Sequence, residues 1–297
     1  EAFVMLAMIP DQALLLFAIP YGLGAGAIDA ALNNFVAQHY SSRHMSWLHC
    51  FWGVGTIVSP FVMSYALTAG AWNLGYRIVG FLQLGIALVL LLTMPVWKKV
   101  PQENLKSQKA VGILEALKIR GVPALIRGVF SYCAIEVTAM NWASIYFVSA
   151  KGIAPEQAAR FASLCYIGIT AGRFLGGFVM NRLGDRRMIL LGAGILSVGC
   201  VLLLIPGDTA LAFAGFLTIG FGCAPVYPCI IHSTPYNFGP ENAAAVIGIQ
   251  MAFAYLGSTF MPLIFGVLGR IAGFWILPLY LLVFVALMVL MTERTFR

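Results

Sequence analysis

The chain has 297 residues, of which 61% are hydrophobic and 10% charged, with a net charge of +7 and a mean hydropathy of +0.90. Soluble domains are about 45–50% apolar and about 25% charged, so this composition excludes an ordinary soluble domain. Long apolar runs recur, and each approaches the roughly 20 residues that a helix needs to cross a bilayer. None alternates with the period of two of a barrel strand. The composition predicts an all-α membrane protein with several spans.

Apolar runs between polar or Pro/Gly breaks define the predicted spans in chain order. They cover residues 12–36, 47–69, 76–96, 121–149, 157–180, 187–206, 209–231, 243–267 and 272–292. Residues 1–10 resemble the tail of one more helix. The stretch "KKVPQENLKSQKAVGILEALKIRG" is charged and only partly apolar, and predicts a cytoplasmic linker whose later part lies on the membrane as an amphipathic helix.

Orientation follows from the distribution of Lys and Arg, because cytoplasmic loops are enriched in both. Alternating loops place most basic residues on one side: Arg43, Lys98, Lys99, Lys106, Lys109, Lys118, Arg120, Arg182, Arg186, Arg187, Arg294 and Arg297. The other side holds Arg77, Lys151, Arg160 and Arg270. The C-terminus is therefore predicted to be cytoplasmic. The net positive charge is explained by the orientation of the chain in the membrane and by attraction to anionic lipid headgroups, so no nucleic-acid partner is expected.

Two parts of the chain resemble each other. "GLGAGAID" (22–29) aligns with "GFGCAPVY" (220–227), and "GVGTIVSP" (53–60) aligns with "YLGSTFMP" (255–262) at nearly the same offset. Ordered matches of this kind predict a duplicated helical bundle with parallel repeats. The register also implies that roughly eighty residues, two helices and most of a third, precede residue 1.

These repeats predict three regions. Residues 1–97 are expected to be the remnant of an N-terminal bundle, from the end of its third helix to its sixth. Residues 98–120 are the predicted linker, and residues 121–297 a complete six-helix bundle holding helices 7 to 12.

The loop "GGFVMNRLGDRRMILLG" resembles the G-x-x-x-D-R-x-G-R-R signature of the major facilitator superfamily. Asn181 stands in place of the acid, and Asp185 in place of a basic residue. The resemblance implies two six-helix halves that expose a central site alternately to each side. It also implies that this loop gates the cytoplasmic end, through Asn181, Arg182, Gly184, Asp185, Arg186 and Arg187.

Other segments resemble the fucose:proton symporter-like branch of that superfamily. "GAIDAALNNFV" looks like its fourth helix, "WLHCFWGVGTIVSP" its fifth, "YCAIEVTAMNWASIYF" its seventh and "TAGRFLGG" its eighth. This resemblance implies a sugar-like substrate moved together with protons. Its coupling acid corresponds to Asp29.

Two carboxylates lie inside predicted spans, where an ionised acid is costly and holds its proton to higher pH. Asp29 has a structural interpretation, in which it reaches cytoplasmic water or hydrogen-bonds a neighbouring helix. It also has two functional interpretations, as a proton carrier or as a substrate ligand. Glu136 lies about fifteen residues into its span, close to mid-membrane, where a solvated role is hard to defend. Arg173 on the next span is the better ion-pair partner for Glu136, because Arg127 is roughly 13 Å away along the helix.

Further polar and aromatic residues are candidates for substrate contact. His49 is either an interfacial residue or a substrate ligand, and Trp142 either a belt tryptophan or a ring that stacks on a sugar. The predicted substrate-binding set is Asn33, His49, Asn141, Trp142, Tyr227 and Gln250.

The sequence thus predicts a secondary active transporter of a small polar solute, and the resemblance implies that this solute is a monosaccharide moved together with protons. A multidrug or metabolite exporter of the same fold is the alternative. A membrane enzyme would need a nucleophile–base pair or a motif such as H-E-x-x-H, which the sequence lacks. We expect no metal or cofactor, a monomer, and a location in a bacterial inner membrane.

Overall fold

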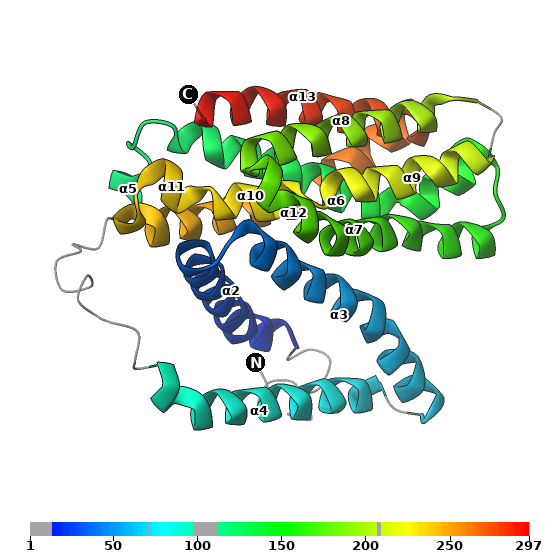
Figure 1. Ribbon diagram of the computed structural model, residues 1–297. Coiled ribbons are helices and arrows are strands. Elements are labelled where there is room, and N and C mark those ends of the chain that lie inside the picture. The colour runs from blue at the N-terminus through cyan, green and yellow to red at the C-terminus, as the bar shows by residue number, and fades with distance from the viewer. Residues whose placement is uncertain (1–13, 71, 98–111, 207–208, 297) are drawn as a thin grey trace. The chain divides into compact units, whose positions relative to one another are not determined.

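The computed structural model describes residues 14–70, 72–97, 112–206 and 209–296, and these residues form helices and short connections without any strand (Figure 1). Among them, eight helical segments are long and apolar enough to cross a membrane. This confirms the prediction of an all-α protein with several membrane spans.

The described residues group into two compact units. One holds the residues up to Ala31 and those from Gly55 to the end of α4, and the other holds Leu32–Val54 and the residues from α5 onward. Helices α2 (Leu14–His39) and α3 (Ser42–Thr68) each contribute to both units. The ends of α2 and α3 that meet at residues 40–41 therefore belong to the same unit as the C-terminal helices.

The first unit consists of the start of α2, the later part of α3, and α4 (Trp72–Trp97). These helices have 26, 27 and 26 residues, and they begin and end within a few residues of the predicted spans. Their surfaces carry large exposed apolar side chains, such as Phe61 at 72% and Leu92 at 71% exposure. Such surfaces suit lipid or further helices and not water.

The second unit contains the predicted C-terminal bundle. Its helices are α6 (Val122–Lys151), α7 (Pro155–Leu183), α8 (Asp185–Leu204), α9 (Thr209–Cys223), α10 (Val226–His232), α11 (Thr234–Phe238), α12 (Pro240–Ala272) and α13 (Leu277–Thr295). A 3₁₀ turn, Phe274–Ile276, precedes α13, and α9 to α11 together form a single interrupted span. The short helix α5 (Ile113–Ala116) lies in the predicted linker, of which residues 98–111 are outside the described residues.

Helix α6 lies at the centre of this bundle. It packs against α7, α12 and α13, and its most apolar window is 72% buried, compared with 33% for α12 and α13. Figure 1 shows α8 and α13 side by side, in agreement with their contacts. The residues that α6 turns toward its neighbours, Glu136 among them, are therefore held away from lipid.

Small residues bring α7 and α9 together. A Cβ atom on Gly220 would lie 3.0 Å from the Cα atom of Gly168, closer than side chains normally approach. Close backbone approach through glycine is the common way for membrane helices to pack. Gly220 thus lies at a close helix crossing, whereas a Cβ on Gly22, Gly26 or Gly55 would meet nothing within 4 Å.

The span formed by α9 to α11 is interrupted at its prolines. α9 ends at Cys223, and Pro225 precedes the first residue of α10. Proline removes a backbone donor and disfavours helix at the residue before it, which explains the break. By contrast, Pro60 and Pro262 lie inside the continuous helices α3 and α12. The break places Tyr227 in the first turn of α10.

Candidate functional site

A buried ion pair joins α6 to α7. Arg173 Nη2 donates a hydrogen bond to Glu136 Oε1 at 3.1 Å, and the two side chains are only 3% and 11% exposed. A buried charge is costly unless a partner of opposite sign compensates it. The structure thus places Arg173 against Glu136, deep within the bundle.

The guanidinium of Arg173 has further partners on α3 and α6. Nη2 also donates to the hydroxyl of Tyr132 at 3.4 Å, and Nη1 donates to the backbone carbonyl of His49 at 3.2 Å. The ring of Trp52 lies 5.2 Å from the guanidinium carbon, within range of a cation–π contact. The Nε atom of Arg173 is buried and has no hydrogen-bond partner in the described structure. This donor remains available to an acceptor on a bound molecule.

A second group of side chains continues the network. His49 Nε2 donates to Asn33 Oδ1 at 3.0 Å, and the edge of the His49 ring faces Tyr227 at 5.0 Å. Tyr227 lies 5.7 Å from the ring of Tyr132. We call Asn33, His49, Tyr132, Glu136, Arg173 and Tyr227 the polar cluster. It draws on α2, α3, α6, α7 and α10, which are far apart in sequence.

Three predicted binding residues lie apart from the polar cluster. Trp142 donates through Nε1 to the carbonyl of Pro262 at 2.9 Å and stacks on Phe274 at 5.3 Å. Asn141 is exposed. Gln250 is fully buried, with Oε1 accepting from Thr234 Oγ1 at 3.1 Å and no partner for Nε2. Their roles in substrate binding stay predictions.

Asp29 is half-buried on α2 and belongs to the first compact unit. It precedes Asn33 by four residues, so both side chains leave the same face of that helix. Its role in proton coupling also stays a prediction.

The predicted gating loop is a turn of one residue. Gly184, with a φ of +78°, separates α7 from α8, and its left-handed backbone favours glycine. Asn181 accepts from the backbone N–H of Arg43 at 3.3 Å, so this loop contacts the α2–α3 junction. Arg186 pairs with Glu293 at 2.6 Å. Arg182 and Arg187 are exposed, and Asp185 contacts His232.

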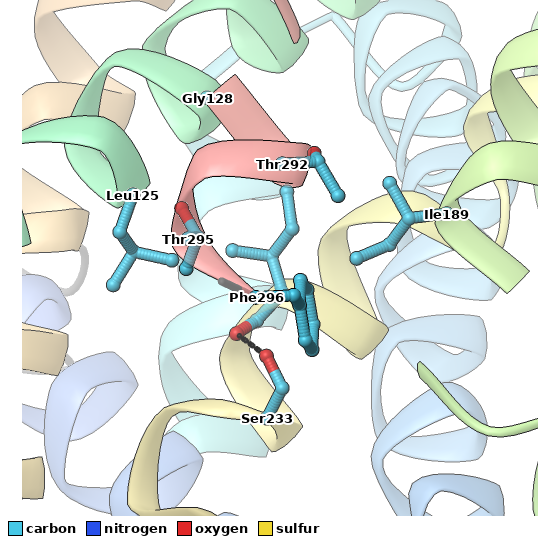
Figure 2. Close-up of a pocket in the computed structure, with 8 residues that line it drawn as sticks. Leu125, Gly128, Ile189, Ser233, Thr292, Thr295 and Phe296 are labelled. Carbon is cyan, nitrogen blue, oxygen red and sulfur yellow. Dashed lines mark hydrogen bonds between the residues drawn. The ribbon is translucent and has the colours of Figure 1, made fainter. Parts of the chain in front are cut away.

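The described part of the chain also contains a small pocket, of about 220 Å³ including its open mouth, at the ends of α6 and α13 (Figure 2). Leu125, Ile189, Thr292 and Phe296 contribute to its lining, and Ser233 lies at one side. No residue of the polar cluster lines it. We assign this pocket no role in binding.

Comparison with known proteins identifies the family. The chain matches the sequence model of the Major Facilitator Superfamily over residues 2–262. The chain belongs to the Major Facilitator Superfamily. Members of this superfamily are transporters, and the eight candidate spans of the described residues agree with a multi-pass membrane protein.

Curated relatives within the Major Facilitator Superfamily are distant. An uncharacterized MFS-type transporter of Yersinia pestis is 23% identical over 256 residues, which is 85% of this chain and 65% of the relative. The glucose/mannose transporter GlcP of Bacillus subtilis is 23% identical over 226 residues, 72% of this chain and 55% of GlcP. The chain thus spans less than two thirds of the length of these relatives.

A solved structure of the superfamily shares the fold. The E. coli fucose:proton symporter FucP matches 98% of this chain and 79% of its own, with a TM-score of 0.78 and 19% sequence identity. This similarity confirms the superfamily fold for the chain.

Sequence reasoning overlooked three side chains of these networks. Tyr132 lies four residues before Glu136, on the same face of α6, and this spacing could have indicated it. Trp52 and His232 gave no such signal, because their contacts come from elements distant in sequence.

Proposed function

We propose that the protein is a secondary active transporter that moves a monosaccharide together with protons by alternating access. The observation that carries this proposal is the buried Glu136–Arg173 pair, which combines a titratable acid with a cation that has an unpartnered donor. The names of the relatives GlcP, a glucose/mannose transporter, and FucP, a fucose:proton symporter, support the same class of solute.

In this proposal, Glu136 links the proton to the sugar. A proton on Glu136 removes the negative charge that holds Arg173 Nη2, so the guanidinium needs other acceptors. Hydroxyl oxygens of a sugar are suitable acceptors for Nη2 and for the unpartnered Nε. Protonation and sugar binding therefore favour each other, which is the thermodynamic requirement for symport.

The remaining cluster residues suit a polyhydroxylated solute. Asn33 and His49 offer amide and imidazole groups, and the aromatic rings of Tyr132 and Tyr227 can pack on the apolar face of a sugar ring. Asp29 loads and releases the transported proton in this scheme. The loop from Asn181 to Arg187 opens and closes the cytoplasmic end.

The test uses the whole gene product that contains this chain, expressed in de-energised bacterial cells. Monosaccharides are added one at a time, and external pH is recorded for the wild type and for Asp29→Asn. Proton symport predicts that one sugar makes the medium more alkaline, and that the variant loses this response.

A multidrug or metabolite exporter remains the alternative. It predicts no pH response to any sugar while the protein is present in the membrane, and proton entry when an exported compound is supplied inside the cells. Either result would overturn the sugar symport proposal.

A further inference from the structure

A second network lies at the end of the bundle predicted to face the cytoplasm. Ser42, at the start of α3, donates through Oγ to Asp185 Oδ1 at 2.9 Å. His232, at the end of α10, lies with Nδ1 2.7 Å from Asp185 Oδ2 and Nε2 3.2 Å from the backbone carbonyl of Tyr40. The α2–α3 junction is thus joined to α8 and α10 through one carboxylate and one imidazole.

Both ring nitrogens of His232 face acceptors. A carboxylate oxygen and a backbone carbonyl accept hydrogen bonds and do not donate them. A neutral imidazole carries one N–H and can make only one of these two bonds, leaving a lone pair against an oxygen at the other. Ser42 Oγ lies 2.9 Å from Asp185 Oδ1 and 3.1 Å from His232 Nδ1, and its single hydroxyl hydrogen can serve only one of these two atoms. A doubly protonated imidazolium gives both of these oxygens a donor, so the closed arrangement favours a second proton on His232.

The other charged groups near α10 do not take the place of Asp185 as the partner of a charged His232. Asp185 on α8 is the charged group in contact with the ring, and Cys229, on the same helix as His232, also lies against that carboxylate. On α8, Arg186 is engaged by Glu293 of α13, and Arg187 is exposed. On α3, Arg43 donates to the backbone carbonyl of Gly177, and His44 is hydrogen-bonded to Ser41. The other titratable side chains of neighbouring helices are exposed: His39, Arg127 and Tyr236. Among the residues that the structure describes, Asp185 is the acid that balances a positive charge on His232.

Opening of the cytoplasmic end would affect the two ring nitrogens of His232 differently. Asp185 and His232 both belong to the C-terminal bundle, whereas Tyr40 and Ser42 belong to the α2–α3 junction. When the junction moves away, the Nδ1 bond to Asp185 is kept and the Nε2 bond to Tyr40 is lost. The second proton on the His232 ring therefore makes a hydrogen bond to Tyr40 only while the cytoplasmic end is closed.

We propose that His232 is a proton-binding site that holds the cytoplasmic gate closed. The His232 side chain is 21% exposed, so the ring exchanges protons with the solution at its own end of the protein. Its proton sets the stability of the closed gate and is not transported. A low cytoplasmic pH keeps the gate closed, and a rise in cytoplasmic pH favours opening. This inference rests on the alternating access of the proposed function, but not on the sugar or on Asp29 and Glu136.

The experiment measures the closed fraction as a function of pH. Spin labels are placed at Gln38→Cys and Tyr236→Cys, two exposed positions on the two sides of the gate, in full-length protein whose native cysteines are replaced. Electron–electron distance distributions are recorded between pH 5.5 and 8.5. One linked proton changes the ratio of closed to open molecules by up to about tenfold per pH unit, so the short distance should decline as pH rises.

Variants separate this site from the proposed coupling site. His232→Gln should make the distribution independent of pH, whereas His39→Gln, an exposed histidine outside the network, should keep the wild-type response. If His232→Gln does not fold, Asp185→Asn should instead reduce the closed fraction and its pH dependence.

Two results would overturn the inference: a distribution independent of pH in the wild type, or one with unchanged pH dependence in His232→Gln. A pH response that disappears in Glu136→Gln and persists in His232→Gln would also overturn it, and would assign the effect to the coupling site. If no sugar is transported but the response still depends on His232, the proposed substrate fails and the gate site stands.

Discussion

At the scale of single residues, Glu136 and Arg173 are two opposite charges in a space from which water is excluded. The pair does not need to stabilise the fold, because the cost of removing both charges from water can equal the attraction between them. The pair matters for function because a change in the charge of one partner alters the hydrogen bonds of the other. A proton on Glu136 leaves Arg173 without its acidic partner, so the local hydrogen bonds must rearrange.

Removal of only one charge should destabilise the protein strongly. Arg173→Met leaves a buried carboxylate without its partner and should lower the free energy of unfolding by about 3–5 kcal/mol, measured by thermal or denaturant unfolding in detergent. The double variant Glu136→Gln/Arg173→Met should recover most of this loss. Arg127→Met, at an exposed arginine of α6, is the matched control and should change stability by about 0.5 kcal/mol or less. A double variant no more stable than Arg173→Met would contradict this account of the pair.

The depth of Glu136 in its span was enough to predict that it needs a partner, and Arg173 on the next apolar run was the nearest suitable cation. The contact of Trp52 with that arginine could not be predicted in the same way, because aromatic residues are ordinary in apolar runs. The role of His232 depends on Tyr40 and Asp185, which are brought to it only by the packing of three helices.

At the scale of elements, close backbone approach determines how the helices pack. The α7–α9 crossing depends on Gly168 and Gly220, whose backbones leave no room for a side chain. The positions of the spans followed from apolar runs and breaks, so the predicted boundaries lie within a few residues of the helices. Which glycines meet another helix could not be predicted, because glycines at crossings and on open surfaces look alike in sequence.

A side chain at the crossing should separate α7 from α9. Gly220→Val should lower stability by about 1–3 kcal/mol or reduce the yield of folded protein, because overpacking displaces both backbones. The control is Gly194→Val on α8, where a Cβ atom meets nothing within 4 Å. Thermal unfolding followed by size-exclusion chromatography compares the two. Equal melting temperatures for both variants would show that the crossing is not tightly packed.

At the scale of the whole molecule, orientation determines which end is the cytoplasmic gate. Basic residues are concentrated on the side that holds Arg43, the Asn181–Arg187 loop and the C-terminus. The positive-inside rule predicts that this side faces the cytoplasm. The gate network around Asp185 and His232 would then respond to cytoplasmic pH.

Reporter fusions test this orientation. A fluorescent protein attached after Arg297 should be bright, because it folds in the cytoplasm, and alkaline phosphatase attached at the same place should be inactive. Fusions after Gly152, at the opposite end of α6, should give the reverse pattern. The opposite result at both positions would invert the predicted topology, and with it the side from which the gate senses pH.

The most direct test of the central claim is the coupling of protons to solute in proteoliposomes that contain the full-length protein. With an imposed pH gradient, the wild type should accumulate a monosaccharide and take up protons in a fixed ratio, and a protonophore should abolish accumulation. Glu136→Gln should lose accumulation but keep exchange of labelled for unlabelled sugar, because it mimics the protonated acid. Accumulation by Glu136→Gln at the wild-type level, or wild-type accumulation that resists the protonophore, would contradict the account.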